Sequence, residues 1–224
     1  MPLALILDMD GLMLDTESLA ARAWDNAARV AGIPFDPRVA PRLVGRNSSD
    51  CRTLVHAHHG GGNYPVDDLM AAWSIAYHAL IEREGVAMKP GLVELLDFLD
   101  AASMPRAVAT STRRARAEHK LARAGLLARV DALVGGDEVT HGKPAPDIFL
   151  LAAQRLGFAP ADCLVLEDSP PGLAAAAAAG IDAIVVPDLV PPPSIGAGRA
   201  PRVMASLHEV RAWLAGRDGR TIVR

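Results

Sequence analysis

Residues 3–11 read LALILDMDG, an apolar run that ends in two aspartates and a glycine. A continuous apolar run of this length is typical of a strand buried on both faces, as in a parallel sheet that helices cover. In such sheets ligands bind beyond the carboxyl ends of the strands, and Asp8 and Asp10 fall at such an end. This segment therefore predicts the kind of sheet and the edge of it that carries a functional site.

Similar apolar runs alternate with helical patterns along the rest of the chain. We expect strands at Leu3–Asp8, Arg106–Thr110, Ala132–Val134, Cys163–Glu167 and Ala183–Val186. We expect helices at Gly91–Ala101, Arg114–Ala124, Asp147–Leu156 and Leu173–Ala179, and then a proline-rich surface loop over Pro187–Pro201. This alternation predicts an α/β fold with a doubly wound, Rossmann-like parallel sheet.

One interval breaks the alternation. Between about Thr16 and Glu84 we find helical patterns only, at Ser18–Ala31, Ser49–His58 and Val66–Arg83. We therefore expect an inserted all-helical cap domain, residues 16–85, within an α/β core catalytic domain made of residues 1–15 and 86–224.

Composition excludes several classes of protein. Half of the 224 residues are hydrophobic and 22% are charged, which is not the composition of a disordered chain. The net charge of −3 argues against a dedicated nucleic-acid binder. No apolar run approaches the roughly 18 residues that span a bilayer, and the N-terminus lacks the features of a signal peptide. We expect a soluble cytoplasmic protein with no membrane partner, a monomer or weak homodimer.

Asp8 and Asp10 together could bind a metal ion or take part in catalysis. Two carboxylates on a loop after a strand can hold Mg²⁺, which prefers oxygen ligands. They can also divide the work of phosphoryl transfer, one attacking phosphorus and the other donating a proton to the leaving oxygen. The plain alternative is a strand end capped by solvated aspartates.

Three more polar positions follow or end predicted strands. Thr110 ends one strand and the Ser111 amide follows it, Lys143 lies in a proline-stiffened loop, and Glu167-Asp168 ends another strand. Taken singly they have ordinary explanations, namely a helix cap, a surface charge and a solvated strand end. A doubly wound fold, however, brings all of them to one edge of the sheet.

This set of residues resembles the four motifs of the haloacid dehalogenase superfamily of phosphotransferases. The motifs are Asp8-Met9-Asp10-Gly11, Thr110, Lys143 and Glu167-Asp168, and the resemblance covers nearly the whole chain. The segments KPAPDIF at 143–149 and EDS at 167–169 are similar to the branch that holds β-phosphoglucomutase and phosphoglycolate phosphatase. The members of this branch have a small helical cap inserted after the first motif.

The resemblance implies a Mg²⁺-dependent phosphatase that hydrolyses a small phosphorylated metabolite, of the sugar phosphate or phosphoglycolate type. Asp8 would be the nucleophile that forms an aspartyl-phosphate, and Asp10 the general acid and then the general base. Thr110 would bind the transferring phosphoryl group, and Lys143 would neutralise charge on it and on Asp8. The dehalogenases of the superfamily lack an acid at the Asp10 position, so Asp10 favours phosphate esters.

The resemblance also implies the remaining ligands. Mg²⁺ would be held by Asp8, the backbone carbonyl of Asp10 and Asp168, with Glu167 close behind. We expect substrate contacts from Gly11, Ser111, Arg46 and Asn47.

Two alternatives stay open. A sugar-phosphate mutase of the β-phosphoglucomutase type carries a His early in its cap, where this chain has Ala20, and a cap Arg whose register differs from that of Arg46. Both departures favour a hydrolase. The third reading is a non-catalytic phosphate-binding module on the same fold, because a fold does not fix a function.

Overall fold

A six-stranded parallel sheet forms the centre of the computed structural model, which describes residues 2–43, 46, 48–188 and 202–218. The strand order is β3-β2-β1-β4-β5-β6, and every neighbouring pair is parallel. The strands are β1 Ala4–Leu7, β2 Arg106–Ala109, β3 Ala132–Val134, β4 Cys163–Glu167, β5 Asp182–Val185 and β6 Arg202–Val203. The predicted fold class is confirmed.

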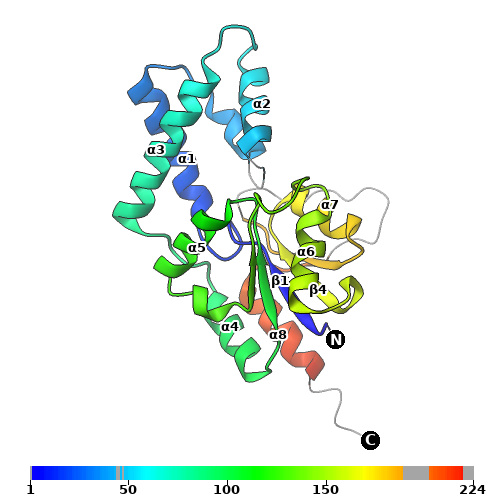
Figure 1. Ribbon diagram of the computed structural model, residues 1–224. Helices are drawn as coiled ribbons and strands as arrows, with labels where there is room; N and C mark the ends of the chain where they lie inside the picture. The colour runs from blue at the N-terminus through cyan, green and yellow to red at the C-terminus, as the bar shows by residue number, and fades with distance from the viewer. Residues whose placement is uncertain (1, 44–45, 47, 189–201, 219–224) are drawn as a thin grey trace, which may run out of the picture.

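Helices cover both faces of this sheet (Figure 1). They are α4 Leu92–Ala101, α5 Arg114–Arg123, α6 Asp147–Leu156, α7 Pro170–Ala178 and α8 Leu207–Asp218, with short 3₁₀ turns at η2 Leu127–Arg129 and η3 Pro160–Asp162. In β1, Leu5 and Leu7 pack with α4, α5 and α8, whereas Ala4 and Ile6 pack with α6 and α7. Both faces of the strand are buried, which explains why its sequence is apolar at every position.

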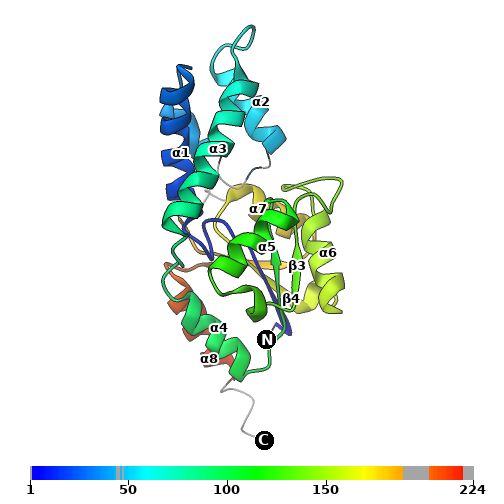
Figure 2. The ribbon, with the colours of Figure 1, turned by 60° about the vertical axis from the view of Figure 1, so that its left-hand side comes forward.

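A helical lobe leaves the sheet after β1 and stands beyond its carboxyl edge (Figures 1 and 2). The lobe consists of α1 Thr16–Ala31, η1 Pro37–Arg42, α2 Ser48–His58 and α3 Val66–Glu84. It has hydrophobic clusters of its own, one around Trp24 and Leu69 and another around Leu19 and Leu80. Most of the buried side chains of the lobe therefore pack against one another rather than against the sheet.

The chain enters and leaves the lobe along two adjacent segments. Asp15 N donates to the Ala87 carbonyl at 2.8 Å, and Lys89 N donates to the Met13 carbonyl at 2.9 Å. A β-bridge pairs Leu14 with Met88 between these two bonds. The two crossings therefore form one short ribbon at the base of the lobe.

Three features differ from the expectations or extend them. No element was expected over residues 202–218, where β6 and α8 lie. Strand β6 consists of two exposed residues, and helix α8 buries Leu207, Val210 and Leu214. Helix α7 begins at Pro170 rather than Leu173, because Ser169 caps it by accepting a bond from Gly172 N. Residues 189–201 of the expected loop lie outside the described residues.

None of the helices in the described part of the chain is long and apolar enough to cross a membrane.

Candidate active site

Six predicted site residues converge at the carboxyl edge of the sheet. They are Asp8 and Asp10 after β1, Thr110 after β2, Lys143 before α6, and Glu167 and Asp168 at the end of β4. The three strands are neighbours, so their ends lie side by side. All six residues are buried except Asp10, whose side chain is 18% exposed.

Lys143 lies between two carboxylates. Its Nζ contacts Asp8 Oδ1, lies 2.5 Å from Glu167 Oε1, and is 3.3 Å from the Ala109 carbonyl oxygen. The Phe149 ring covers it, with the centroid 5.0 Å from Nζ. Burial alone would lower the pKa of Lys143, but the charges of Asp8 and Glu167 outweigh burial and raise the pKa, so this buried lysine stays protonated.

Glu167 supports Lys143 and the loop that follows β4. Its Oε2 accepts bonds from Asp168 N at 3.0 Å and from Ser169 N and Oγ, both at 2.9 Å. A Cβ on Gly172 would lie 1.7 Å from Glu167 Oε1, so only glycine allows this approach. With Oε1 on Lys143, both oxygens of the carboxylate have protein donors.

Asp10 is held by three side-chain donors. Its Oδ2 accepts bonds from Thr110 Oγ1 at 3.1 Å and Thr112 Oγ1 at 2.7 Å, and its Oδ1 lies 2.7 Å from Lys120 Nζ. The centroid of the Tyr77 ring, on the lobe helix α3, is 5.1 Å from the same Nζ. Burial would raise the pKa of Asp10, but the Lys120 charge and the bonds from Lys120 and Thr112 lower it, which favours the carboxylate form.

Sequence reasoning missed Lys120 and Thr112. A signal for Lys120 was present, because it lies beside Leu121 and three residues after Ala117, on the apolar stripe of a predicted helix. A lysine on such a stripe is buried only when it has a partner. Thr112 has no comparable signal.

Asp8 and Asp168 are buried acids whose charged forms are disfavoured in this site. Burial raises the pKa of Asp8, with Glu167 and Asp10 adding to the rise and Lys143 opposing it. Burial and the charges of Glu167 and Asp8 likewise raise the pKa of Asp168. Asp168 Oδ2 is fully buried and has no hydrogen-bond donor among the described residues. A hard divalent cation beside Asp8 and Asp168 would relieve both penalties, so these residues fit Mg²⁺.

Across the described residues, no group of three or more His, Cys, Asp or Glu side chains converges closely enough to bind a metal by itself. A Mg²⁺ site needs only one or two carboxylates, because carbonyl, water and phosphate oxygens complete it. The lack of a three-residue cluster among the described residues therefore does not conflict with a Mg²⁺ site at Asp8 and Asp168.

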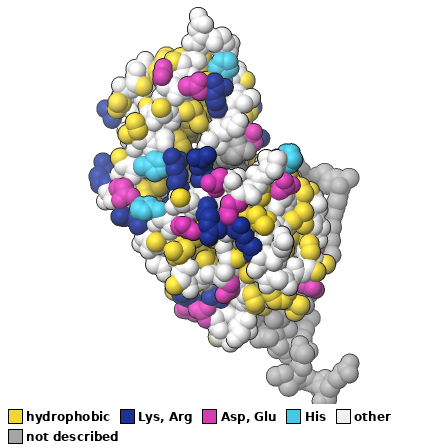
Figure 3. All heavy atoms as spheres, in the orientation of Figure 1, with side chains coloured by type: hydrophobic (Ala, Val, Ile, Leu, Met, Phe, Trp, Pro, Cys, Tyr) yellow, Lys and Arg dark blue, Asp and Glu magenta, His cyan; other side chains and the backbone are white. Residues whose placement is uncertain are grey.

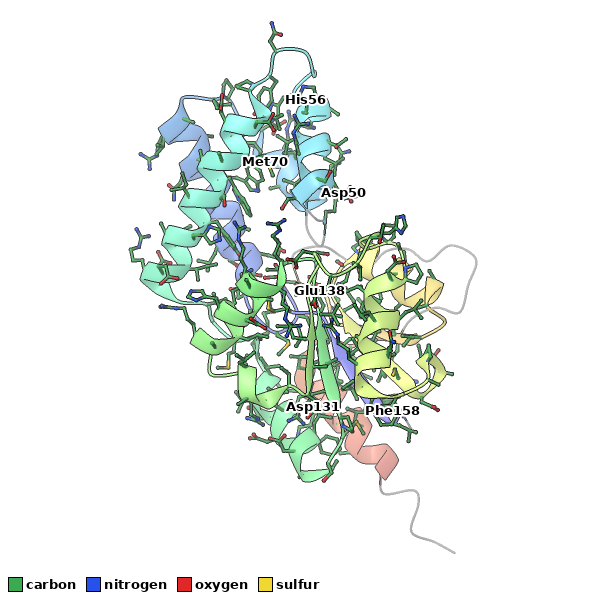
Figure 4. The ribbon with its side chains drawn as sticks, viewed as in Figure 1. Asp50, His56, Met70, Asp131, Glu138 and Phe158 are labelled. Carbon is green, nitrogen blue, oxygen red and sulfur yellow. The ribbon has the colours of Figure 1, made fainter. Side chains whose placement is uncertain are left out.

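A cavity of about 380 Å³ lies between the lobe and the core, with Asp8 and Asp10 in its lining. The lobe contributes mainly apolar side chains, including Met70 on α3 (Figure 4). It also contributes four aromatic residues, Trp24, Phe35, Trp73 and Tyr77. Their rings stack in series with centroid separations of 4.9, 5.1 and 4.9 Å, so one wall of the cavity is a continuous row of aromatic rings.

Basic side chains border the same cavity, and Figure 3 shows Lys and Arg gathered where the lobe meets the core. Arg46 is exposed, lines the cavity, and donates from Nε to the Arg42 carbonyl at 3.0 Å. Ser111 also lines the cavity. Gly11 lies against Asp168 instead, and Asn47 lies outside the described residues.

Comparisons with known proteins agree on one family. Residues 3–180 match the family model described as haloacid dehalogenase-like hydrolase. Fructose-1-phosphate phosphatase YqaB of Escherichia coli is 37% identical over 81% of this chain and 95% of its own length. Hexitol phosphatase A of the same organism is 36% identical, covering 81% of each chain.

A solved structure agrees with these matches. The crystal structure of CbbY from Rhodobacter sphaeroides in complex with phosphate is 28% identical in sequence, with a TM-score of 0.78. The match covers 94% of this chain and 96% of that one.

Replacing Lys143 by methionine tests its position between two buried carboxylates. Lys143→Met should lower the free energy of unfolding by about 3–5 kcal/mol, because removing one partner leaves buried charges uncompensated. Urea denaturation followed by circular dichroism measures the change. Arg52→Met, which breaks the exposed pair with Asp67, is the matched control and should leave the midpoint nearly unchanged. Equal midpoints for the two variants would show that the Lys143 contacts do not stabilise the fold.

Proposed function

The chain belongs to the haloacid dehalogenase-like hydrolase family, and we propose that it is a Mg²⁺-dependent phosphatase of small phosphorylated metabolites that works through an aspartyl-phosphate. The observation that carries this proposal is the separation of two aspartates on one loop. Asp8 is paired with Lys143, while Asp10 is held apart by Lys120, Thr110 and Thr112. Such a division assigns different tasks to the two carboxylates.

Asp8 is the nucleophile. Its carboxylate attacks phosphorus, the bond from phosphorus to the ester oxygen breaks, and a phosphoryl group is left on Asp8. Attack by an anion on a phosphate dianion is repulsive, and the Lys143 ammonium at Asp8 reduces that repulsion. Mg²⁺, when bound at Asp8, Asp168 and the Asp10 carbonyl, supplies further positive charge to the transferring group.

Asp10 moves the protons. In its protonated form it gives a proton to the leaving ester oxygen, which departs as an alcohol. The resulting carboxylate then takes a proton from water, whose oxygen attacks the phosphorus on Asp8 and releases inorganic phosphate. The contacts of Asp10 with Lys120, Thr110 and Thr112 match the carboxylate form that precedes this second step.

Glu167 serves as a support rather than a direct metal ligand. Both of its oxygens already accept from protein donors, and it fixes Lys143 beside Asp8. Thr110 donates its hydroxyl to Asp10 and lines the same cavity as Asp8, and its proposed role is to bind phosphoryl oxygens there.

A phosphorylated sugar or similar polyol phosphate is the proposed substrate. The relatives named above include a fructose-1-phosphate phosphatase and a hexitol phosphatase. The cavity between the lobe and the core has room for such a leaving group, and we propose that residues 16–85 act as a cap that closes over it. Hydrolysis is favoured over mutase activity because Ala20, in the cavity lining, offers no proton donor or acceptor at its side chain.

A panel of phosphate esters tests the function directly. Sugar phosphates, hexitol phosphates, phosphoglycolate and an aryl phosphate are assayed for inorganic phosphate release, with Mg²⁺ and with a chelator. We expect release that requires Mg²⁺, no activity in Asp8→Asn, and a loss of about 10²–10⁴-fold in Asp10→Asn. Near-normal activity in Asp8→Asn would disprove the aspartyl-phosphate, and no turnover of any ester would disprove the phosphatase.

Lys120 is expected to act through Asp10. Lys120→Met should lower kcat by about 10- to 100-fold, less than the about 10²–10⁴-fold expected for Asp10→Asn, because Asp10 stays but loses its strongest donor. Lys120→Arg should recover part of the loss. Arg123→Met on the same helix removes an exposed pair with Glu82 and is the control. If Lys120→Met and Arg123→Met have the same kcat, Lys120 has no part in catalysis.

Arg46 is the candidate for a second anionic group on the substrate. Arg46→Ala should lower kcat/KM about tenfold for phosphoglycolate, since a charge-assisted bond is lost, and should change it little for an aryl phosphate without a second charge. Arg38→Ala, an exposed arginine of the same lobe paired with Asp36, is the control. A similar effect on both substrates would show that Arg46 does not bind a second anionic group of the substrate.

A further inference from the structure

We propose that Asp188 is an additional carboxylate of the metal site, held in place by Lys89, and that it binds water of the ion's hydration shell. The proposal rests on the Mg²⁺ site of the proposed function and adds two residues to it. Neither residue belongs to the motifs found in the sequence.

Two buried carboxylate oxygens, one from Asp168 and one from Asp188, lie near Gly11. Asp168 Oδ2 and Asp188 Oδ2 are both buried without a hydrogen-bond donor among the described residues. A Cβ built on Gly11 would lie 2.3 Å from Asp168 Oδ2 and 3.3 Å from Asp188 Oδ2. Gly11 also has a φ of +88°, where a side chain is strained. The absence of a side chain at Gly11 therefore leaves room for both oxygens.

Asp188 is held from its other side. Lys89 Nζ lies 2.6 Å from Asp188 Oδ1, and the two side chains are 22% and 8% exposed. This pair fixes the carboxylate, so that Oδ2 is the oxygen left to face Asp168 and Gly11. A buried carboxylate oxygen without a donor is costly, and water or a cation must satisfy it.

The charges around this point also favour a cation. Burial, with the charges of Asp10 and Asp188 adding to it, raises the pKa of Glu17 to about 8. Asp188 is thus one of several acids whose negative charge acts on Glu17. Mg²⁺ keeps several of its waters when it binds to protein, and those waters need acceptors such as Asp188 Oδ2.

Lys89 belongs to the segment that returns from the lobe. Its amide donates to Met13, one residue before the Leu14–Met88 bridge. The ion pair with Asp188 therefore links the metal edge of the sheet to the base of the lobe.

Calorimetric titration of the metal-free full-length protein with Mg²⁺ tests the proposal without an activity assay. Asp188→Asn keeps the shape of the side chain and should weaken Mg²⁺ binding about tenfold, the size of effect seen when a supporting acceptor is lost. Asp182→Asn, at the opposite end of β5, should bind Mg²⁺ as the wild type does. Asp168→Asn, at a proposed direct ligand, should bind much more weakly than Asp188→Asn.

Thermal unfolding without metal shows whether each variant is folded, and Asp188→Ser replaces Asp188→Asn if the latter is not. Equal Mg²⁺ affinity for Asp188→Asn and wild type would overturn the role of Asp188 and leave the proposed function intact, provided that Asp168→Asn is impaired. No saturable Mg²⁺ binding by the wild type would overturn both.

Discussion

A buried ammonium group between two buried carboxylates is the interaction on which the rest of the site depends. The charges of Asp8 and Glu167 outweigh the burial of Lys143 and keep it protonated, and Lys143 in turn opposes the rise that burial causes in the pKa of Asp8. Each partner comes from a different part of the chain, and Glu167 is itself fixed by the amides of Asp168 and Ser169. The sheet must bring the ends of β1 and β4 together before any of these charges is compensated.

The other two aspartates of the site, Asp10 and Asp168, have surroundings that differ from those of Asp8. Asp10 turns away from Lys143 to a second lysine on α5, so the two aspartates of one short loop have separate cations. Asp168, by contrast, is left with an oxygen that has no hydrogen-bond donor within the part of the chain that the structure describes. The residues proposed as nucleophile, proton carrier and metal ligand thus differ in their partners and not in residue type, since all three are aspartates.

Much of this organisation can be predicted from the sequence, because it depends on local patterns. Strands buried on both faces are apolar at every position, and polar residues that end them must meet at one edge, which predicts Asp8, Thr110 and Asp168. The contacts of Lys120 and Lys89 join segments far apart in the chain, and no local pattern specifies such pairs. Strand β6 was not predicted because two exposed residues have no apolar signal, and α8 was overlooked although Leu207, Val210 and Leu214 share the spacing of a helical face.

The ribbon at the base of the lobe has a consequence for how such a protein can diversify. The chain leaves the sheet and returns to it through neighbouring, hydrogen-bonded segments, so the intervening residues form a module whose two ends coincide. A module attached in this way can be lengthened, shortened or exchanged while the register of the strands stays the same. If the lobe binds the leaving group as proposed, substrate recognition can vary independently of the phosphorus chemistry proposed for the edge of the sheet.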